Sequence, residues 1–449
     1  MSTTVKSDTT SAAAAELKKR IEGRTLVVGV LGLGYVGLPL ALAFAEKRLS
    51  VIGFDVDPEK IEALKAGRHY IQHLEGPRLA SATSSGLFRA TLDFAELSKP
   101  DVLLICVPTP LTPQREPDMS FVVNTVRQIQ PRLRRGQLVV LESTTYPGTT
   151  DELVRGILEE SGLRCGEDFF LAFSPEREDP GNSRYTTAGI PKVVGGVDPV
   201  SGDLAQAVYE LAIDRTVRVS TARTAEATKL VENIFRAVNI ALVNELKIVL
   251  DKMGIDIWEV LDAASTKPFG FMRFNPGPGL GGHCIPLDPF YLAWKAREYG
   301  VTAKFIELAG EVNVQMPHYV VEKLQYALNE RGKATRGSRI LVLGLAYKKD
   351  VDDARESPAF EIIDALLRRG AAVCYHDPHV PRVPRTRAWP GLASMSSETL
   401  TPERLAAQDA VVIVTDHSAV DYDLVLRHAP LIIDSRGVYR QPASNVVKA

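Results

Sequence analysis

The chain has 449 residues, of which 45% are hydrophobic and 24% charged, a composition typical of globular proteins with two or three domains. Its 53 basic and 55 acidic residues give a net charge of −2, which argues against a protein that coats nucleic acid or a membrane surface. Four widely spaced cysteines, and the absence of a secretory leader or of an apolar run near the roughly 20 residues that span a bilayer, favour the cytoplasm. We expect a cytoplasmic protein that binds a small molecule.

The first motif joins a strand to a helix. An apolar strand over residues 25–31 is followed by Gly-Leu-Gly-Tyr-Val-Gly at 32–37 and by a helical run over 38–47. In such a turn Gly32 permits the sharp bend, Gly34 lets a pyrophosphate approach, and Gly37 lets the helix pack closely. The positive end of the helix then stabilises the phosphate charge. The pattern predicts a dinucleotide site.

A carboxylate indicates which dinucleotide binds. A second strand, residues 51–54, ends in Asp55, 18 positions after Gly37. A carboxylate there accepts hydrogen bonds from the ribose hydroxyls of NAD and repels the extra phosphate of NADP. We therefore expect NAD, and we also assign Tyr35, Val36 and Lys60 to this site.

Two further strands end in threonine-containing segments. Residues 102–107 lead into Pro108-Thr109-Pro110, and residues 138–141 lead into Glu142-Ser-Thr-Thr145. Ligands of open α/β sheets bind at the carboxyl ends of the strands, so Thr109 and Thr145 are candidate cofactor contacts. Each could equally cap the helix that follows it.

A long helical pattern begins near residue 225 and continues past residue 248. Apolar residues recur on it at a helical period. Lys229 and Asn233 are four positions apart and share one face, beside the apolar stripe. Single lysines on helices are usually solvated, but this pair could also stabilise a developing oxyanion.

A glycine-rich segment presents a cysteine. Residues 277–288 read Gly-Pro-Gly-Leu-Gly-Gly-His-Cys-Ile-Pro-Leu-Asp, with Cys284 after the glycines and Asp288 four positions later. Glycines allow close approach of a ligand, and a thiolate is a strong nucleophile near neutral pH. An isolated cysteine would more often be a buried structural residue. These surroundings instead favour a catalytic nucleophile.

A third unit begins near residue 337 with an apolar strand over 338–345. Its alternation of strands and helices is typical of a second nucleotide-binding α/β unit. It lacks Gly-x-Gly-x-x-Gly, so we do not expect it to bind a second dinucleotide. Its Lys348, Lys349 and Arg355 could hold phosphates, bridge domains or form a solvated charged face. His376 and His379 form an HxxH, which we interpret as turn residues, and we expect no metal site.

Seven segments follow one another in order from about residue 26 to 440. They are Gly32 to Pro39, Pro108-Thr-Pro, Phe173-Ser-Pro-Glu176-Arg, Lys229 with Asn233, Gly279 to Asp288, Ala346-Tyr-Lys348-Lys-Asp with Arg355-Glu-Ser, and Asp434-Ser-Arg436. Together they resemble the UDP-glucose/GDP-mannose dehydrogenase family, and within it the branch acting on UDP-N-acetylglucosamine.

The resemblance implies a four-electron oxidation of a sugar C6 alcohol to a carboxylate with two NAD in succession. A thiol suits this chemistry because Cys284 can add to the intermediate aldehyde, and the thiohemiacetal can be oxidised to a thioester that water hydrolyses. Lys229 and Asn233 would stabilise oxyanions, while Asp288, or Glu176 through a water, would handle protons.

Further contacts follow from the resemblance alone. It places Glu176 and Arg177 in a substrate-contacting loop, together with Lys229 and Asn233. The remaining substrate contacts that it implies are Gly279, Gly281, Lys348 and Arg436, and the cofactor contact is Arg355.

The segments Lys267 to Arg273 and Gly281 to Pro289 resemble the branch acting on UDP-N-acetylglucosamine, and two departures separate the chain from the UDP-glucose enzymes. Leu287 stands where many of those carry a lysine, and the arginine that reaches across their subunit interface is not evident. We expect UDP-N-acetylglucosamine, oxidised for surface polysaccharide synthesis, with UDP-glucose and UDP-N-acetylmannosamine as alternatives. A two-electron 3-hydroxyacid-type dehydrogenase, a nucleotide-sugar epimerase and an NAD-sensing binding protein are the rival functions.

The predicted fold class is α/β, with two Rossmann-like doubly wound domains joined by a long central helix and a helical domain. We expect an N-terminal extension over 1–24, an NAD-binding domain over 25–215, a central helical domain over 216–330 and a UDP-sugar-binding domain over 331–449. Because the central helix carries more apolar surface than one small domain can cover, we expect a homodimer or a higher homo-oligomer.

Overall fold

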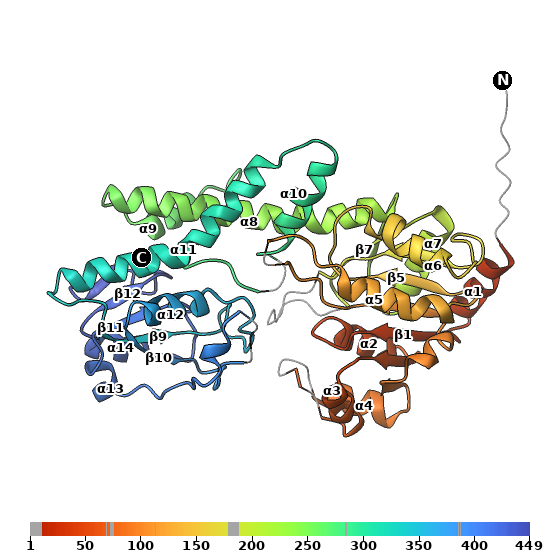
Figure 1. Cartoon of the computed structure of the whole chain (residues 1–449), viewed down its shortest axis with the longest axis horizontal. Helices are drawn as coiled ribbons and strands as arrows, with labels where there is room; N and C mark the ends of the chain where they lie inside the picture. The colour runs from red at the N-terminus through yellow and green to blue at the C-terminus, as the bar shows by residue number, and fades with distance from the viewer. Residues whose placement is uncertain are drawn as a thin grey trace. The chain divides into compact units, whose positions relative to one another are not determined.

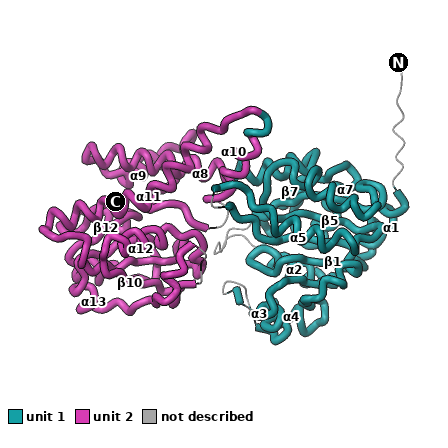
Figure 2. Tube along the Cα trace, in the orientation of Figure 1, with its two compact units in different colours: residues 1–232, 297–299 teal, residues 233–296, 300–449 magenta. Residues whose placement is uncertain are grey.

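The computed structural model describes residues 11–68, 70–71, 76–112, 114–177, 188–282, 285–384, 386 and 388–449. It divides into two compact units, which Figure 2 shows in different colours. The first unit contains residues 1–232 and 297–299, and the second contains residues 233–296 and 300–449. Helix α8, Ala222–Lys252, continues from the first unit into the second.

The first unit is built on one sheet, which has eight strands in the described residues, in the order β3-β2-β1-β4-β5-β6-β7-β8. Neighbouring strands are parallel except β6 and β7, which pair antiparallel. The strands are β1 Val27–Leu31, β2 Ser50–Phe54, β3 Phe88–Thr91, β4 Val102–Ile105, β5 Leu138–Leu141, β6 Phe170–Phe173, β7 Lys192–Gly196 and β8 Thr216–Val219.

Helices cover both faces of this sheet, because alternate strand residues point to opposite sides. Val28 and Val30 join one apolar cluster with α1, α2 and α7, whereas Leu103 and Ile105 join another with α5 and α6. The helices are α1 Ala12–Glu22, α2 Gly37–Glu46, α3 Pro58–Lys65, α4 Gly76–Ser84, α5 Ser120–Ile129, α6 Arg155–Glu159 and α7 Pro199–Tyr209. Short helical turns are Phe94–Ser98, Gln130–Arg132 and Thr149–Val154.

The second unit contains a smaller sheet, which within the described residues has five strands, all parallel, in the order β10-β9-β11-β12-β13. Apolar clusters form on both of its faces, one with α11 and α12 and the other with α13 and α14. The strands are β9 Arg339–Leu343, β10 Ala372–His376, β11 Ala410–Ile413, β12 Ile432–Asp434 and β13 Val446–Lys448.

The remaining elements are mostly helical and are visible in Figure 1. They are α9 Ile257–Ala264, α10 Asp288–Glu298, α11 Lys304–Asn329, α12 Pro358–Arg368, α13 Pro402–Ala406, α14 Tyr422–His428 and the short turn Pro390–Leu392. The predicted fold class is therefore confirmed: two doubly wound α/β sheets, with a long central helix and further helices between them in the chain.

Among the helices of the described residues, none has the length and apolar run that crossing a bilayer requires.

Candidate functional site

The turn between β1 and α2 contains two glycines, Gly32 and Gly37, at which any side chain would collide with the backbone. Gly32 has φ +92°, and a Cβ on it would lie 2.5 Å from the carbonyl oxygen of Cys106. A Cβ on Gly37 would lie 1.9 Å from the carbonyl oxygen of Gly32. Around Gly34, in contrast, no heavy atom lies within 4 Å of the Cβ position. The turn is thus closed on the sheet side and open at Gly34, where a pyrophosphate could approach.

Asp55, at the end of β2, is buried and fixes this turn. Its Oδ2 accepts a hydrogen bond from the backbone N–H of Leu33 at 2.8 Å, and Oδ1 accepts one from Asp57 at 3.0 Å. Lys60 lies 3.2 Å from Oδ2. A carboxylate can accept about four hydrogen bonds, so these described contacts leave capacity for a ribose hydroxyl. The residues present fit NAD, which Gly32, Gly34, Gly37 and Asp55 would hold.

The other predicted cofactor contacts of the first unit lie in loops at the carboxyl ends of β1, β4 and β5. Tyr35 and Val36 belong to the glycine turn and are half-buried. Thr109 is buried after β4, and Thr145 is buried after β5, with its Oγ1 2.5 Å from Oγ1 of Thr149. Neither threonine caps the next helix, because the N-cap residues there are Met119 and Gly148. The capping alternative is therefore wrong for both.

Glu176 and Lys229 are brought together in the first unit. The Lys229 ammonium donates to the backbone carbonyl of Glu176 at 2.5 Å, and Lys229 is buried, with 7% of its surface exposed. Arg177 instead turns away from this pair and makes two hydrogen bonds to Glu232, at 2.6 and 3.2 Å. Its guanidinium also donates to the carbonyl of Pro191 at 2.7 Å, so in this structure Arg177 is paired within the first unit.

A buried group of polar residues beside Glu176 was not predicted from the sequence. The Lys192 ammonium lies 2.5 Å from Oε2 of Glu142 and 3.6 Å from Oε2 of Glu176, and the Tyr209 hydroxyl donates to Glu142. Burial raises the pKa of Glu142, although Lys192 opposes the effect. A lysine opening an otherwise apolar strand was the only sequence signal for this group.

In the second unit, Asn233 donates its side-chain amide to Oδ2 of Asp288. Asp288 is buried and is the first residue of α10. Lys229 and Asn233 lie one helical turn apart on α8, as the sequence predicted. The predicted nucleophile, Cys284, lies outside the described residues.

The glycine-rich segment packs against the carboxyl end of the second sheet. A Cβ on Gly277 would lie 2.6 Å from Nη1 of Arg436, and one on Gly281 would lie 2.5 Å from Cβ of Tyr347. Gly279 has φ +138°, and the N–H of Gly282 donates to the carbonyl of Arg355 at 3.0 Å. The predicted substrate segment and the loop after β9 are therefore neighbours.

The predicted cations of this unit have different environments. Arg436 follows β12 and donates to the carbonyl of Val414 at 2.6 Å; burial lowers the pKa of its guanidinium. Lys348 is half-buried in the loop after β9. The Arg355 guanidinium is held by Asp353, with the shortest contact 2.6 Å.

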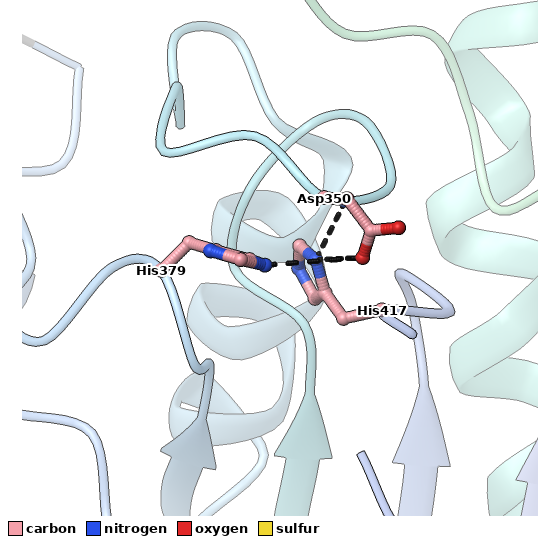
Figure 3. A group of neighbouring side chains, drawn as sticks. All are labelled: Asp350, His379 and His417. Carbon is pink, nitrogen blue, oxygen red and sulfur yellow. Dashed lines mark hydrogen bonds and ion pairs between the residues drawn. The ribbon is translucent and has the colours of Figure 1, made fainter. Parts of the chain in front are cut away.

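Asp350, His379 and His417 form a group at the ends of β9, β10 and β11 that could be taken for metal ligands (Figure 3). His417 is buried, and both ring nitrogens are engaged: Nδ1 accepts the N–H of Asp350 and Nε2 lies 3.0 Å from Oδ2 of Asp377. Burial raises the pKa of Asp377, but the contact with His417 and hydrogen bonds from the backbone N–H groups of Ala346 and His379 outweigh it and lower this pKa below its usual value. The hydrogen bonds of His417 tie the loop after β9 to the sheet. The buried Nε2 of His379 lies 3.8 Å from Oδ1 of Asp350 and has no hydrogen bond among the described residues.

The fold and this geometry define a two-sheet α/β protein with a dinucleotide turn in the first sheet and a cluster of cations and glycines at the end of the second. Matches to the UDP-glucose/GDP-mannose dehydrogenase family cover its NAD binding domain at residues 26–213, its central domain at 223–315 and its UDP binding domain at 341–441. The chain belongs to this family of NAD-dependent nucleotide-sugar dehydrogenases.

Individual relatives extend over most of the chain. UDP-N-acetyl-D-glucosamine 6-dehydrogenase of Pseudomonas aeruginosa is 37% identical, over 88% of this chain and 91% of that protein. NDP-N-acetyl-D-galactosaminuronic acid dehydrogenase of Ralstonia nicotianae is 35% identical, over 92% and 96%. The solved structure of UDP-D-ManNAc dehydrogenase from Pyrococcus horikoshii has a TM-score of 0.84 and 32% identity, covering 94% of this chain and 98% of that one. The relatives share a reaction class but differ in the sugar named.

Proposed function

We propose that the protein oxidises the C6 hydroxyl of UDP-N-acetylglucosamine to a carboxylate in two successive two-electron steps. The observation that carries the proposal is the hydrogen bond between Asn233 and the buried Asp288. Asn233 lies on α8, the helix that also carries Lys229, and Asp288 follows Cys284 by four residues. NAD, when bound, takes up a hydride in each oxidation. The overall reaction consumes one water and yields a carboxylate, two NADH and three protons.

The roles of the chain's residues follow from their chemistry. The Cys284 thiolate adds to the aldehyde carbon formed in the first oxidation, and the oxygen becomes an oxyanion. Lys229 and Asn233 supply the donors that stabilise it. After the second oxidation water hydrolyses the thioester, with Asp288, or Glu176 through a water, taking the proton and the thiolate leaving.

The proposal also assigns the ligands to parts of the chain. Residues 25–215 hold the cofactor, 216–330 form the central catalytic and dimerisation region, and 331–449 hold the UDP group through Lys348 and Arg436. Gly279 and Gly281 would line the substrate site, and Gly281 lets this segment pack against Tyr347, because a Cβ there would lie 2.5 Å from Cβ of Tyr347. Arg177 and Arg355 complete the contacts to substrate and cofactor.

UDP-N-acetylglucosamine is preferred to the alternatives on two grounds. The relative of that name is 37% identical, and Leu287 stands where a UDP-glucose enzyme would carry a lysine. UDP-N-acetylmannosamine, UDP-N-acetylgalactosamine and UDP-glucose are the competing substrates.

The test is an NADH assay with these four UDP-sugars. We expect the highest kcat/KM with UDP-N-acetylglucosamine and two NADH per sugar consumed. Cys284→Ser should abolish formation of the acid, because a hydroxyl at this position is a far poorer nucleophile than a thiolate. One NADH per sugar would contradict the second oxidation, and unchanged acid formation by Cys284→Ser would contradict the role of the thiol. A preference for UDP-glucose would overturn the substrate assignment.

A further inference from the structure

Lys192 is a buried cation shared by two carboxylates. It is 6% exposed, and its ammonium lies 2.5 Å from Oε2 of Glu142 and 3.6 Å from Oε2 of Glu176. Glu142 is itself buried and also accepts a hydrogen bond from the Tyr209 hydroxyl. A cation this deep in the protein is costly unless it is paired, so its two partners account for its presence.

The sheet topology explains why Lys192 meets Glu176. β6 and β7 form the antiparallel pair, with Phe173 opposite Gly195 and Ala172 opposite Gly196. Each step forward along one strand is a step backward along the other. Three more steps beyond β6 therefore place Glu176 opposite Lys192, the first residue of β7. If β7 were parallel to β6, Lys192 would lie near the amino end of β6, far from Glu176.

The segment that carries Glu176 is fastened by several neighbouring groups. Ser174 donates its hydroxyl to the carbonyl of Val193 at 2.8 Å, and Arg177 donates to the carbonyl of Pro191 at 2.7 Å. Oε1 of Glu176 accepts the N–H of Arg177 at 2.6 Å. The backbone around Glu176 is therefore held by other groups, and the positive charge of Lys192 acts on Oε2 of the Glu176 carboxylate.

The charges around Glu176 come from four elements. Lys192 begins β7, Glu142 follows β5, Lys229 and Glu232 lie on α8, and Tyr209 ends α7. The Cys106 thiol after β4 is a further titratable neighbour of Lys192. Burial opposes the charge of Lys192, but Glu142 and Glu176 outweigh it and raise the pKa of the ammonium above its usual range. Lys192 thus remains the cation at neutral pH.

We propose that Lys192, held by Glu142, is a positioning residue that orients Glu176 for proton transfer and supplies the positive charge beside it. The inference rests on the proposed function, in which Glu176 acts on a proton through a water. Without the cation, two carboxylates would face each other in a poorly solvated site, and their repulsion would displace Glu176 unless a proton separates them. Without the charge of Glu142, Lys192 would pair with Glu176 alone, which would strengthen this interaction.

The test compares the acidic limb of the kcat/KM profile in variants of opposite expected sign. In Lys192→Met the limb should move to higher pH by about one unit, with activity partly recovered at alkaline pH. In Glu142→Gln it should move to lower pH. Lys192→Arg keeps the cation and should restore the wild-type profile. Lys99→Met, which removes an exposed lysine paired with Glu96, is the matched control and should leave the profile unchanged.

Opposite shifts separate this role from a purely structural one, which would lower activity equally at every pH. If Lys192→Met does not fold, Glu142→Gln and Lys192→Arg still decide the question. Limbs that coincide with the wild type in both Lys192→Met and Glu142→Gln would overturn the role of Lys192 while leaving the proposed function intact. A wild-type protein that oxidises no UDP-sugar would remove both proposals.

Discussion

Glu226 lies in the second turn of α8 with its carboxylate buried against the loop after β5. Oε2 accepts the N–H of Gly148 at 2.7 Å, and Oε1 accepts the N–H and hydroxyl of Thr150 at 2.9 and 2.7 Å. Burial outweighs these hydrogen bonds and raises the pKa of Glu226 from 4.5 to about 7. The folded protein therefore holds this proton more tightly than the unfolded chain does.

This proton makes stability depend on pH. The contribution of Glu226 is fully present below pH 4.5 and is lost as pH rises through about 7. Relative to Glu226→Gln, which has no such proton, the wild type should lose on the order of 3 kcal/mol of unfolding free energy between pH 4.5 and 8. Urea unfolding of both proteins across this range measures the difference. A difference that stays constant with pH would contradict the titration of Glu226.

Single residues also show what could be predicted from sequence. Asp55 was predictable because its meaning depends on a local spacing from Gly37 along one strand-turn-helix unit. The neighbours of Glu176 were not predictable, because Glu142 and Lys192 are 50 positions apart in the chain and meet only through strand pairing. Hydrophobic patterns locate strands but do not say which strand pairs antiparallel.

At the scale of elements, Asn244 connects three segments of the second unit. On α8, its amide donates to Oδ1 of Asn313 on α11 at 3.0 Å, and its Oδ1 accepts the N–H of Gly277 at 3.0 Å. All three residues are buried. The glycine-rich segment thus begins from a fixed point on the long helix.

Asn244→Ala should therefore destabilise the protein. The buried N–H of Gly277 and the amide oxygen of Asn313 would each lose a partner, at a combined cost of about 2–4 kcal/mol. Asn239→Ala is the matched control, because Asn239 is only half-buried on the same helix and its hydrogen bond to the carbonyl of Phe235 is exposed. We expect the control to change stability by about 0.5 kcal/mol or less. Equal thermal shifts in the two variants would contradict the anchoring role of Asn244.

Apolar patterns in the sequence predict central strands of the two sheets but not all of their edge strands. The strands over 102–105 and 138–141 are found within the ranges expected from their apolar runs. β8, in contrast, has intermediate and exposed residues and no apolar run, and β13 has only three residues, so neither was expected. Edge strands are specified by the neighbour they pair with rather than by their own burial.

At the scale of the whole molecule, α8 leaves an apolar stripe exposed in the single chain. Leu242, Leu246 and Val249 are 51%, 40% and 49% exposed, and Met253, directly after the helix, is 64% exposed. The spacing of four and three residues places Leu242, Leu246 and Val249 on one face of the helix. Exposed apolar surface of this kind marks an interaction site, and a second copy of the chain is the partner we predict.

Light scattering coupled to size exclusion tests this prediction. A chain of 49.1 kDa should elute with twice that mass, about 98 kDa. Leu242→Lys combined with Val249→Lys places two charges within the stripe, and desolvating them on association would be too costly, so the mass should fall to that of the monomer. Leu367→Lys, on α12 and outside the stripe, is the matched control and should remain dimeric. A wild-type mass of one chain would contradict the dimer, and a dimeric double variant would place the interface elsewhere.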